Sequence, residues 1–253
     1  MAPLKTGEPA GARGVFETLL VRKGRPVFFE EHVERFAKGC AHYRLEGAPG
    51  ADDLRTAAAN SIASIGLDYG VLRWSAWTDG SPVPAFWSIS ATPPRDHMMK
   101  ATWTAKVSHA PMPSLGPESA HKHLGRKAWL ESLAVARAAG ADEAILADSE
   151  GRVIEGAVSN VFHISKGILT TPPLSLGPLP GIVRGKVLAL ARELKIPTAE
   201  EPVTLDALEK ADEIFLTNSL IGIRPLAALD DRRLPAPGPI TAKLQAEWTR
   251  LYG

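Results

Sequence analysis

The chain has 253 residues, 45% of them apolar and 23% charged, which is typical of a globular protein with one large domain or two of ordinary size. Its formal net charge is +1 with scattered basic residues, which argues against nucleic acid or an anionic membrane surface as a partner. Cys40, the single cysteine, cannot form an internal disulfide, and neither a signal sequence nor a bilayer-spanning apolar run is present, so we expect a cytoplasmic protein.

The first part of the chain predicts a β-hairpin, two helices and three strands. Strand formers from Val15 to Val21, a turn at 23–24 and an extended stretch from Pro26 to Phe29 are typical of a hairpin. Apolar residues at helical spacing follow in segment 30–45, and a second helix is expected at 52–67 with Asp52 as a candidate N-cap. The three strands are expected at 69–78, 85–92 and 101–110.

The second part follows a proline-rich break and mixes strands with helices. We expect a helix over Leu124–Ala139, which Gly140 ends. Further on, the expected elements are strand-turn-strand units at 143–156 and 159–173, helices at 180–195, 205–211 and 241–252, and strands at 213–218 and 222–229. Without strict alternation of strands and helices, this order favours the α+β class. We predict a smaller N-terminal α/β domain at 1–110, a linker at 111–120 and a larger C-terminal domain at 121–253.

Several familiar motifs are absent from the sequence. Segment 180–186 resembles a P-loop, but Pro180 replaces its first glycine and Val187 its Ser/Thr. Neither a dinucleotide-binding G-x-G-x-x-G after a strand nor a G-x-S-x-G nucleophile elbow occurs. His121 and His123 lack other residues at ligand spacing, so we expect no metal site.

Two residues could instead carry amine chemistry. Lys122 lies just before a helix among small and apolar neighbours, and a lysine amine becomes a nucleophile when burial or a nearby cation lowers its pKa. Glu155 ends a strand between Ile154 and Gly156. Taken alone, the lysine is more typical of a solvated surface charge and the glutamate of an exposed sheet edge.

Three further features could hold a phosphate. Segment 179–185 starts a helix with a glycine, which leaves backbone N–H groups for an anion. Segment 217–222 offers hydroxyl, amide and backbone donors, and Arg35 could bind phosphate through two parallel hydrogen bonds. A lysine, a carboxylate and such anion sites together are what pyridoxal phosphate requires, because the lysine binds its aldehyde carbon and the carboxylate its ring nitrogen.

With these residues in place, the chain resembles the fold type IV pyridoxal-phosphate enzymes, the class IV aminotransferase family. The stretches that carry the resemblance occur in the family's order at 14–36, 121–126, 141–164, 169–188 and 211–226. The resemblance implies a two-domain fold similar to D-amino acid aminotransferase, with pyridoxal 5'-phosphate in the cleft between the domains. It also implies a homodimer.

The resemblance further assigns roles to single residues. Lys122 would be the Schiff-base lysine, which also moves protons, and Glu155 the partner of the pyridine nitrogen. Asn160 would shape the wall behind the ring. The remaining cofactor contacts would come from Arg35, Gly181, Ile182, Val183, Asn218 and Ser219. Candidate substrate contacts are Phe16, Thr18, Arg73 and Arg126.

Within the family, segments 122–126 and 218–226 look most like 4-amino-4-deoxychorismate lyases, which release 4-aminobenzoate and pyruvate in folate biosynthesis. The first alternative is an aminotransferase of branched-chain or D-amino acids. A second alternative is a ligand-binding homologue with impaired catalysis. It is suggested by Gly125, where the lyases usually have asparagine, and by Val183, where threonine is common.

Overall fold

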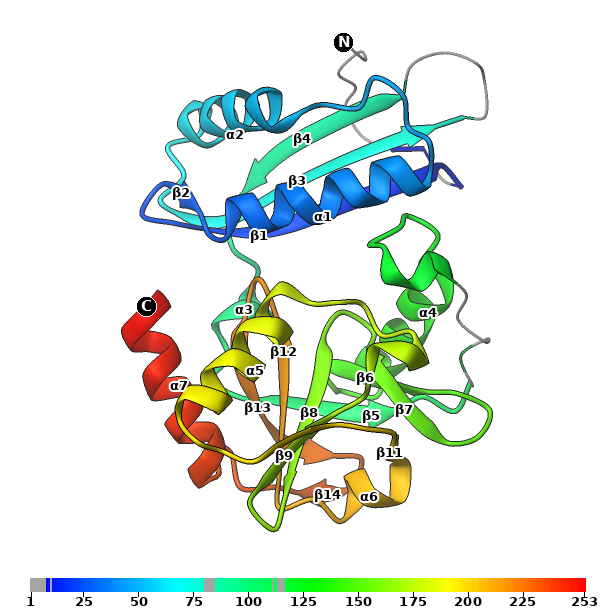
Figure 1. Cartoon of the computed structure of the whole chain (residues 1–253), viewed down its shortest axis with the longest axis vertical. Helices are drawn as coiled ribbons and strands as arrows, with labels where there is room; N and C mark the ends of the chain where they lie inside the picture. The colour runs from blue at the N-terminus through cyan, green and yellow to red at the C-terminus, as the bar shows by residue number, and fades with distance from the viewer. Residues whose placement is uncertain (1–7, 10, 80–84, 111, 113–116) are drawn as a thin grey trace. The chain divides into compact units, whose positions relative to one another are not determined.

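The computed structural model describes residues 8–9, 11–79, 85–110, 112 and 117–253 (Figure 1). These residues form two compact units. The first comprises the described residues of Met1–Met99 together with His121–Arg126, and the second those of Lys100–Ala120 together with Lys127–Gly253. The division therefore differs from the predicted boundary at residue 110, and the segment around Lys122 belongs with the N-terminal unit. The predicted linker at 111–120 lies partly outside the described residues, whereas Met112 packs in a core cluster of the second unit.

The first unit is a four-stranded antiparallel sheet with two helices on one face (Figure 1). Alternate residues of the strands face the helices, and the buried Trp74 contacts Phe29 and Phe36 edge to face there. The sheet order is β2-β1-β3-β4. The elements are β1 Arg13–Arg22, β2 Arg25–Pro26, α1 Phe29–His42, α2 Ala51–Ser64, β3 Tyr69–Thr78, β4 Phe86–Thr92 and α3 Asp96–Met99.

Three predicted element boundaries differ from the structure for a clear local reason. The second hairpin strand is only two residues long, because Phe28 is left-handed, with φ of 57°, and α1 begins at the next residue. The N-cap of α2 is Gly50 rather than Asp52, and the side chain of Asp53 accepts the Gly50 N–H at 3.0 Å. The helix predicted for Leu124–Ala139 begins only at Lys127, because the backbone of the preceding residues pairs with β1.

The second unit contains a mixed ten-stranded sheet, and its helices and strands confirm the predicted α+β class (Figure 1). The strand order is β10-β9-β8-β12-β13-β5-β6-β7-β11, and β14 pairs with β13. Its strands are β5 Trp103–Val107, β6 Glu143–Ala147, β7 Arg152–Gly156, β8 Asn160–Ser165, β9 Ile168–Thr171, β10 Thr198–Glu200, β11 Val203–Thr204, β12 Glu213–Asn218, β13 Gly222–Leu229 and β14 Arg232–Arg233. Its helices are η1 Pro117–Ala120, α4 Lys127–Ala138, η2 Leu174–Leu176, α5 Ile182–Glu193, α6 Leu205–Glu209 and α7 Pro239–Tyr252.

Buried polar side chains as well as apolar packing hold this unit together. Phe162 and Phe215 stack at 4.9 Å on the neighbouring strands β8 and β12. The buried carboxylate of Glu213 accepts N–H groups of Ile240 and Thr241, at 3.0 and 2.8 Å, at the start of α7. Among the helices that lie in the described residues, none has the length and apolar character needed to cross a membrane.

Candidate active site

The predicted site residues lie in both units. The first unit contains Phe16, Thr18, Arg35, Arg73, Lys122 and Arg126. The second contains Glu155, Asn160, Gly181, Ile182, Val183, Asn218 and Ser219.

Lys122 is fixed by backbone hydrogen bonds to β1. The Phe16 N–H donates to the Lys122 carbonyl at 2.9 Å, and the Leu124 N–H donates to the Gly14 carbonyl at 2.8 Å. Val15 and His123 form an isolated antiparallel bridge between these two bonds. The lysine thus has a defined backbone position outside any helix, and its Nζ lies 4.9 Å from the centre of the Phe16 ring.

Of the predicted substrate contacts, Phe16 supplies this ring and Arg73 lies over it. Phe16 and Thr18 are two apart on β1 and share one face of the strand, as expected from the sequence. Arg73 pairs with Thr18 across β1 and β3, and its guanidinium carbon lies 4.0 Å from the centre of the Phe16 ring. Arg126 is buried, and its backbone N–H donates to the Leu124 carbonyl at 2.8 Å. Their contact with a substrate stays a prediction.

Arg35 has an ion pair that the sequence did not suggest. Its Nε donates to Oε1 of Glu17 at 2.7 Å, and one terminal nitrogen donates to Oε2 at 2.8 Å. Nδ1 of His32 lies 2.7 Å from the same carboxylate. Although burial alone would raise the pKa of Glu17, the charges of Arg35 and His32 hold it well below its usual range. The predicted role of Arg35 at a phosphate stays a prediction.

In the second unit, Glu155 is held by two donors from distant parts of the chain. Trp129 Nε1–H donates to its Oε1 at 2.8 Å, and the Leu179 N–H donates to its Oε2 at 2.9 Å. The residue is 3% exposed, so it is not the solvated edge carboxylate that its sequence context alone favours. Sequence reasoning missed Trp129 and Leu179, because they lie 26 and 24 residues from Glu155 and share no local pattern with it.

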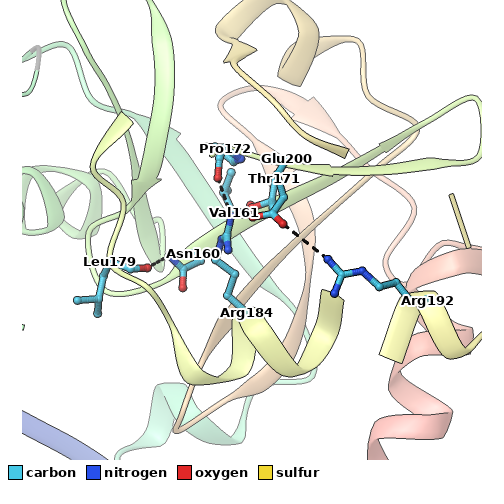
Figure 2. A network of polar contacts seen from close by, with 8 residues as sticks. All are labelled: Asn160, Val161, Thr171, Pro172, Leu179, Arg184, Arg192 and Glu200. Carbon is cyan, nitrogen blue, oxygen red and sulfur yellow. Dashed lines mark hydrogen bonds and ion pairs between the residues drawn. The ribbon is translucent and has the colours of Figure 1, made fainter. Parts of the chain in front are cut away.

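Asn160 connects this carboxylate to the start of α5. Its Nδ2 donates to the Leu179 carbonyl at 2.8 Å, as Figure 2 shows. A Cβ on Gly181, the N-cap of α5, would lie 2.0 Å from Asn160 Oδ1, so only glycine fits beside the amide. Ile182 and Val183 form the first turn of the helix, whose N–H groups are not bonded within the helix.

Further along α5, Arg184 ties the helix to neighbouring segments. Its guanidinium donates to the Pro172 carbonyl at 3.0 Å and pairs with Glu200 at 2.7 Å, and Arg192 lies 3.8 Å from the other Glu200 oxygen (Figure 2). Arg184 is buried, and its guanidinium joins α5 to Pro172 and to Glu200 of β10.

Asn218 joins two loops through its side-chain amide. Oδ1 accepts the N–H groups of Leu220 and Ile221 at 2.9 and 3.0 Å, and Nδ2 donates to the Val158 carbonyl at 3.0 Å. Thr217 lies beside it, and its buried hydroxyl has no hydrogen-bond partner among the residues that the structure describes. Such an unsatisfied hydroxyl is a candidate donor for a ligand.

The side chain of Glu143 accepts hydrogen bonds from the loop between Glu155 and Asn160. Oε2 accepts the Ser159 hydroxyl at 2.7 Å and the Val158 N–H at 3.2 Å, and Oε1 accepts the Ala144 N–H at 2.9 Å. Burial raises the pKa of Glu143 to about 7, despite these hydrogen bonds, which lower it.

The residues of the second unit suit pyridoxal 5'-phosphate. A buried carboxylate held by two N–H donors remains an acceptor, as a protonated ring nitrogen requires. The start of α5 offers backbone N–H groups, and Thr217 and Ser219 offer hydroxyl groups, of the kind that bind phosphate. Across the described part of the chain, no three His, Cys, Asp or Glu side chains gather at metal-binding distance.

Comparison with known proteins gives consistent matches. Residues 14–229 match the amino-transferase class IV family. A candidate branched-chain-amino-acid aminotransferase of Methanocaldococcus jannaschii is 38% identical over 147 residues, which are 57% of this chain and 50% of that protein.

Two solved structures resemble the whole chain. A branched-chain aminotransferase of Thermoproteus uzoniensis with norvaline has a TM-score of 0.86 at 28% identity, covering 94% of this chain and 85% of that one. A candidate 4-amino-4-deoxychorismate lyase of Legionella pneumophila has a TM-score of 0.87 at 24% identity, covering 97% and 96%. At that identity the second likeness supports the fold alone.

Proposed function

Because this chain belongs to the class IV aminotransferase family, whose fold type IV enzymes use pyridoxal 5'-phosphate, we propose that it transfers amino groups to and from small apolar amino acids of the branched-chain type. The proposed cofactor chemistry is supported by two residues that hydrogen bonds hold in place. These are Lys122, whose backbone bonds to β1, and the buried Glu155. Substrate class rests on the sequence similarity to branched-chain aminotransferases. The lyase that segments 122–126 and 218–226 favoured becomes the second candidate, since its support among the comparisons is a likeness of fold.

In this proposal each residue has a defined task. The bound cofactor supplies an electron sink for charge that develops on the substrate carbon. Lys122 would hold the cofactor covalently, and its amine would move a proton at the substrate α-carbon. Glu155 would hold the proton on the pyridine nitrogen. Further contacts, in the proposal, come from Asn160 behind the ring and from Arg35, Gly181, Ile182, Val183, Asn218 and Ser219 at the phosphate.

The first experiment tests Lys122. The purified protein should carry the absorbance of lysine-bound cofactor, and borohydride reduction followed by peptide mass spectrometry should place the cofactor mass on Lys122. Lys127→Ala is a matched control, since this neighbouring lysine is exposed on α4. A Lys122→Ala protein that still fixes cofactor with borohydride would overturn the assignment.

The second experiment separates the two candidate reactions. The aminotransferase should move amino groups from L-leucine, L-valine or their D-isomers to keto acids, with matching changes in cofactor absorbance. A lyase should instead release pyruvate from 4-amino-4-deoxychorismate without an amino acceptor. Pyruvate release with no amino transfer would contradict the aminotransferase. The homodimer and the cytoplasmic location stay predictions; light scattering of the purified protein tests the dimer.

A further inference from the structure

The face of the first sheet opposite α1 and α2 carries polar side chains. Along β1, β3 and β4, alternate residues pack into the helix-covered core, and the residues between them face the other way. Strand register places Thr18 opposite Arg73, Phe16 opposite Ser75, and Ser75 opposite Ser88. A guanidinium and three hydroxyls therefore lie on this face.

These groups bind a carboxylate that belongs to the chain itself. Arg73 forms an ion pair with Oε1 of Glu8, and the Ser75 hydroxyl donates to Oε2 at 3.1 Å. Ser88 Oγ lies 2.9 Å from Ser75 Oγ and helps to orient that hydroxyl. Partial burial alone would raise the pKa of Glu8, but Arg73 lowers it, which keeps the carboxylate ionised. Both oxygens of Glu8 are thus engaged by charge and hydroxyl donors, as a bound ligand carboxylate would be.

Arg73, which holds this carboxylate, shares the ring of Phe16 with the residue that carries the proposed chemistry. Arg73 and Lys122 both lie over the ring of Phe16, at 4.0 and 4.9 Å from its centre. Glu8 neutralises Arg73, which would otherwise attract a second carboxylate to the neighbourhood of the lysine. With Glu8 in place, the charge of Arg73 is matched, and the apolar ring of Phe16 lies between the guanidinium and Lys122 Nζ as a shared contact.

We propose that Arg73 and Ser75 form a carboxylate-binding site beside Lys122, and that Glu8 fills it and so disfavours substrates that bring a second carboxylate to this face. The substrate part of this inference rests on the proposed function. An internal ligand acts at an effective concentration in the millimolar range, so a free dicarboxylate has to compete against it. Glu8 is therefore a specificity-determining residue that favours monocarboxylic amino acids and keto acids.

Equilibrium binding of two inert probes to the purified holoenzyme tests the inference by calorimetry. Glutarate carries two carboxylates and 3-methylbutanoate carries one. Glu8→Gln should bind glutarate about tenfold more tightly than the unaltered protein, with 3-methylbutanoate changed by less than about threefold. The gain should disappear when Arg73→Met is added to Glu8→Gln. Glu34→Gln, which alters an exposed carboxylate on α1, should behave like the unaltered protein.

Three results would overturn the inference: unchanged glutarate binding in Glu8→Gln, an equal gain for both probes, or a gain that survives the loss of Arg73. Thermal unfolding of each variant verifies that it is folded. The probes are not turned over, so the outcome does not depend on which reaction the enzyme catalyses. A protein that binds glutarate as expected but transfers no amino group would contradict the proposed function and leave the carboxylate site standing.

Discussion

At the scale of single residues, Gly181 shows how tightly the start of α5 fits against Asn160. Its φ of −68° suits any amino acid, so glycine is required there only because a larger side chain lacks space. A methyl group would lie 2.0 Å from Asn160 Oδ1 and displace an amide that also bonds to Leu179. We expect Gly181→Ala to lower the free energy of unfolding by about 1–3 kcal/mol and to weaken cofactor binding, measured by urea unfolding and absorbance titration.

Gly185 provides the control for this substitution in the same helix. A Cβ at Gly185 meets no atom within 4 Å, and the residue lies in the helix interior. Gly185→Ala should therefore raise the free energy of unfolding by about 0.5–1 kcal/mol, because alanine favours helices. Equal effects of the two substitutions would show that backbone preference, rather than the contact with Asn160, explains Gly181.

At the scale of elements, α7 depends on a carboxylate from β12. Glu213 accepts two N–H groups at the first turn of α7, and a glutamine side chain offers only one acceptor oxygen for them. We expect Glu213→Gln to lower the free energy of unfolding by about 1–3 kcal/mol in urea titrations. Glu209→Gln, at an exposed position on α6, should change it by less than about 0.5 kcal/mol. A loss of equal size in both variants would refute the capping role.

The elements also show what periodicity can predict. The alternation in β1 and β3 and the helical spacing in α1 and α5 are local, and the predicted elements exist. The short strands β10, β11 and β14 were not predicted, because two or three residues carry no readable period. The late start of α4 could not be predicted either. The sequence predicts a helix from Leu124, but the backbone at 122–124 bonds to β1, more than 100 residues earlier in the chain.

At the scale of the whole molecule, buried ionisable groups set the pH dependence of stability. Burial raises the pKa of Glu143 from the ordinary value of 4.5 to about 7, so between these pH values the folded state binds more protons than the unfolded state. The contribution of Glu143 to the free energy of unfolding is therefore fully present below pH 4.5 and is lost as the pH rises to about 7. His32 acts oppositely: burial lowers its pKa, so its contribution is lost as the pH falls below 6.5. Glu17 loses its contribution below pH 4.5.

Comparison of the unaltered protein with Glu143→Gln isolates the first contribution, because His32 and Glu17 are present in both. Between pH 4.5 and 7, the free energy of unfolding of the unaltered protein should fall relative to the variant by on the order of 3 kcal/mol, measured by urea unfolding at several pH values. Ser159→Ala should move the upper limit to higher pH, since the hydroxyl stabilises the charged form. Parallel pH profiles would disprove this account.

Family, fold class and cofactor could all be predicted from the order of the sequence segments, and the comparisons confirm them. The preference for a lyase depended on two short segments, 122–126 and 218–226. Trp129, Leu179 and Glu8 had no sequence signal, because each contacts its partner across 24 to 67 residues of chain. Such partners follow from three-dimensional packing rather than from local pattern.

The side chain of Asn218 has a consequence for anyone who wishes to redesign this enzyme. One amide fixes both the loop that contains Val158 and the loop that contains Leu220 and Ile221. If a library of variants changes one loop alone, only those variants whose changed loop still fits the unchanged loop would fold correctly. New variants should therefore be drawn from paired changes in both loops, with Asn218 either retained throughout or replaced together with them.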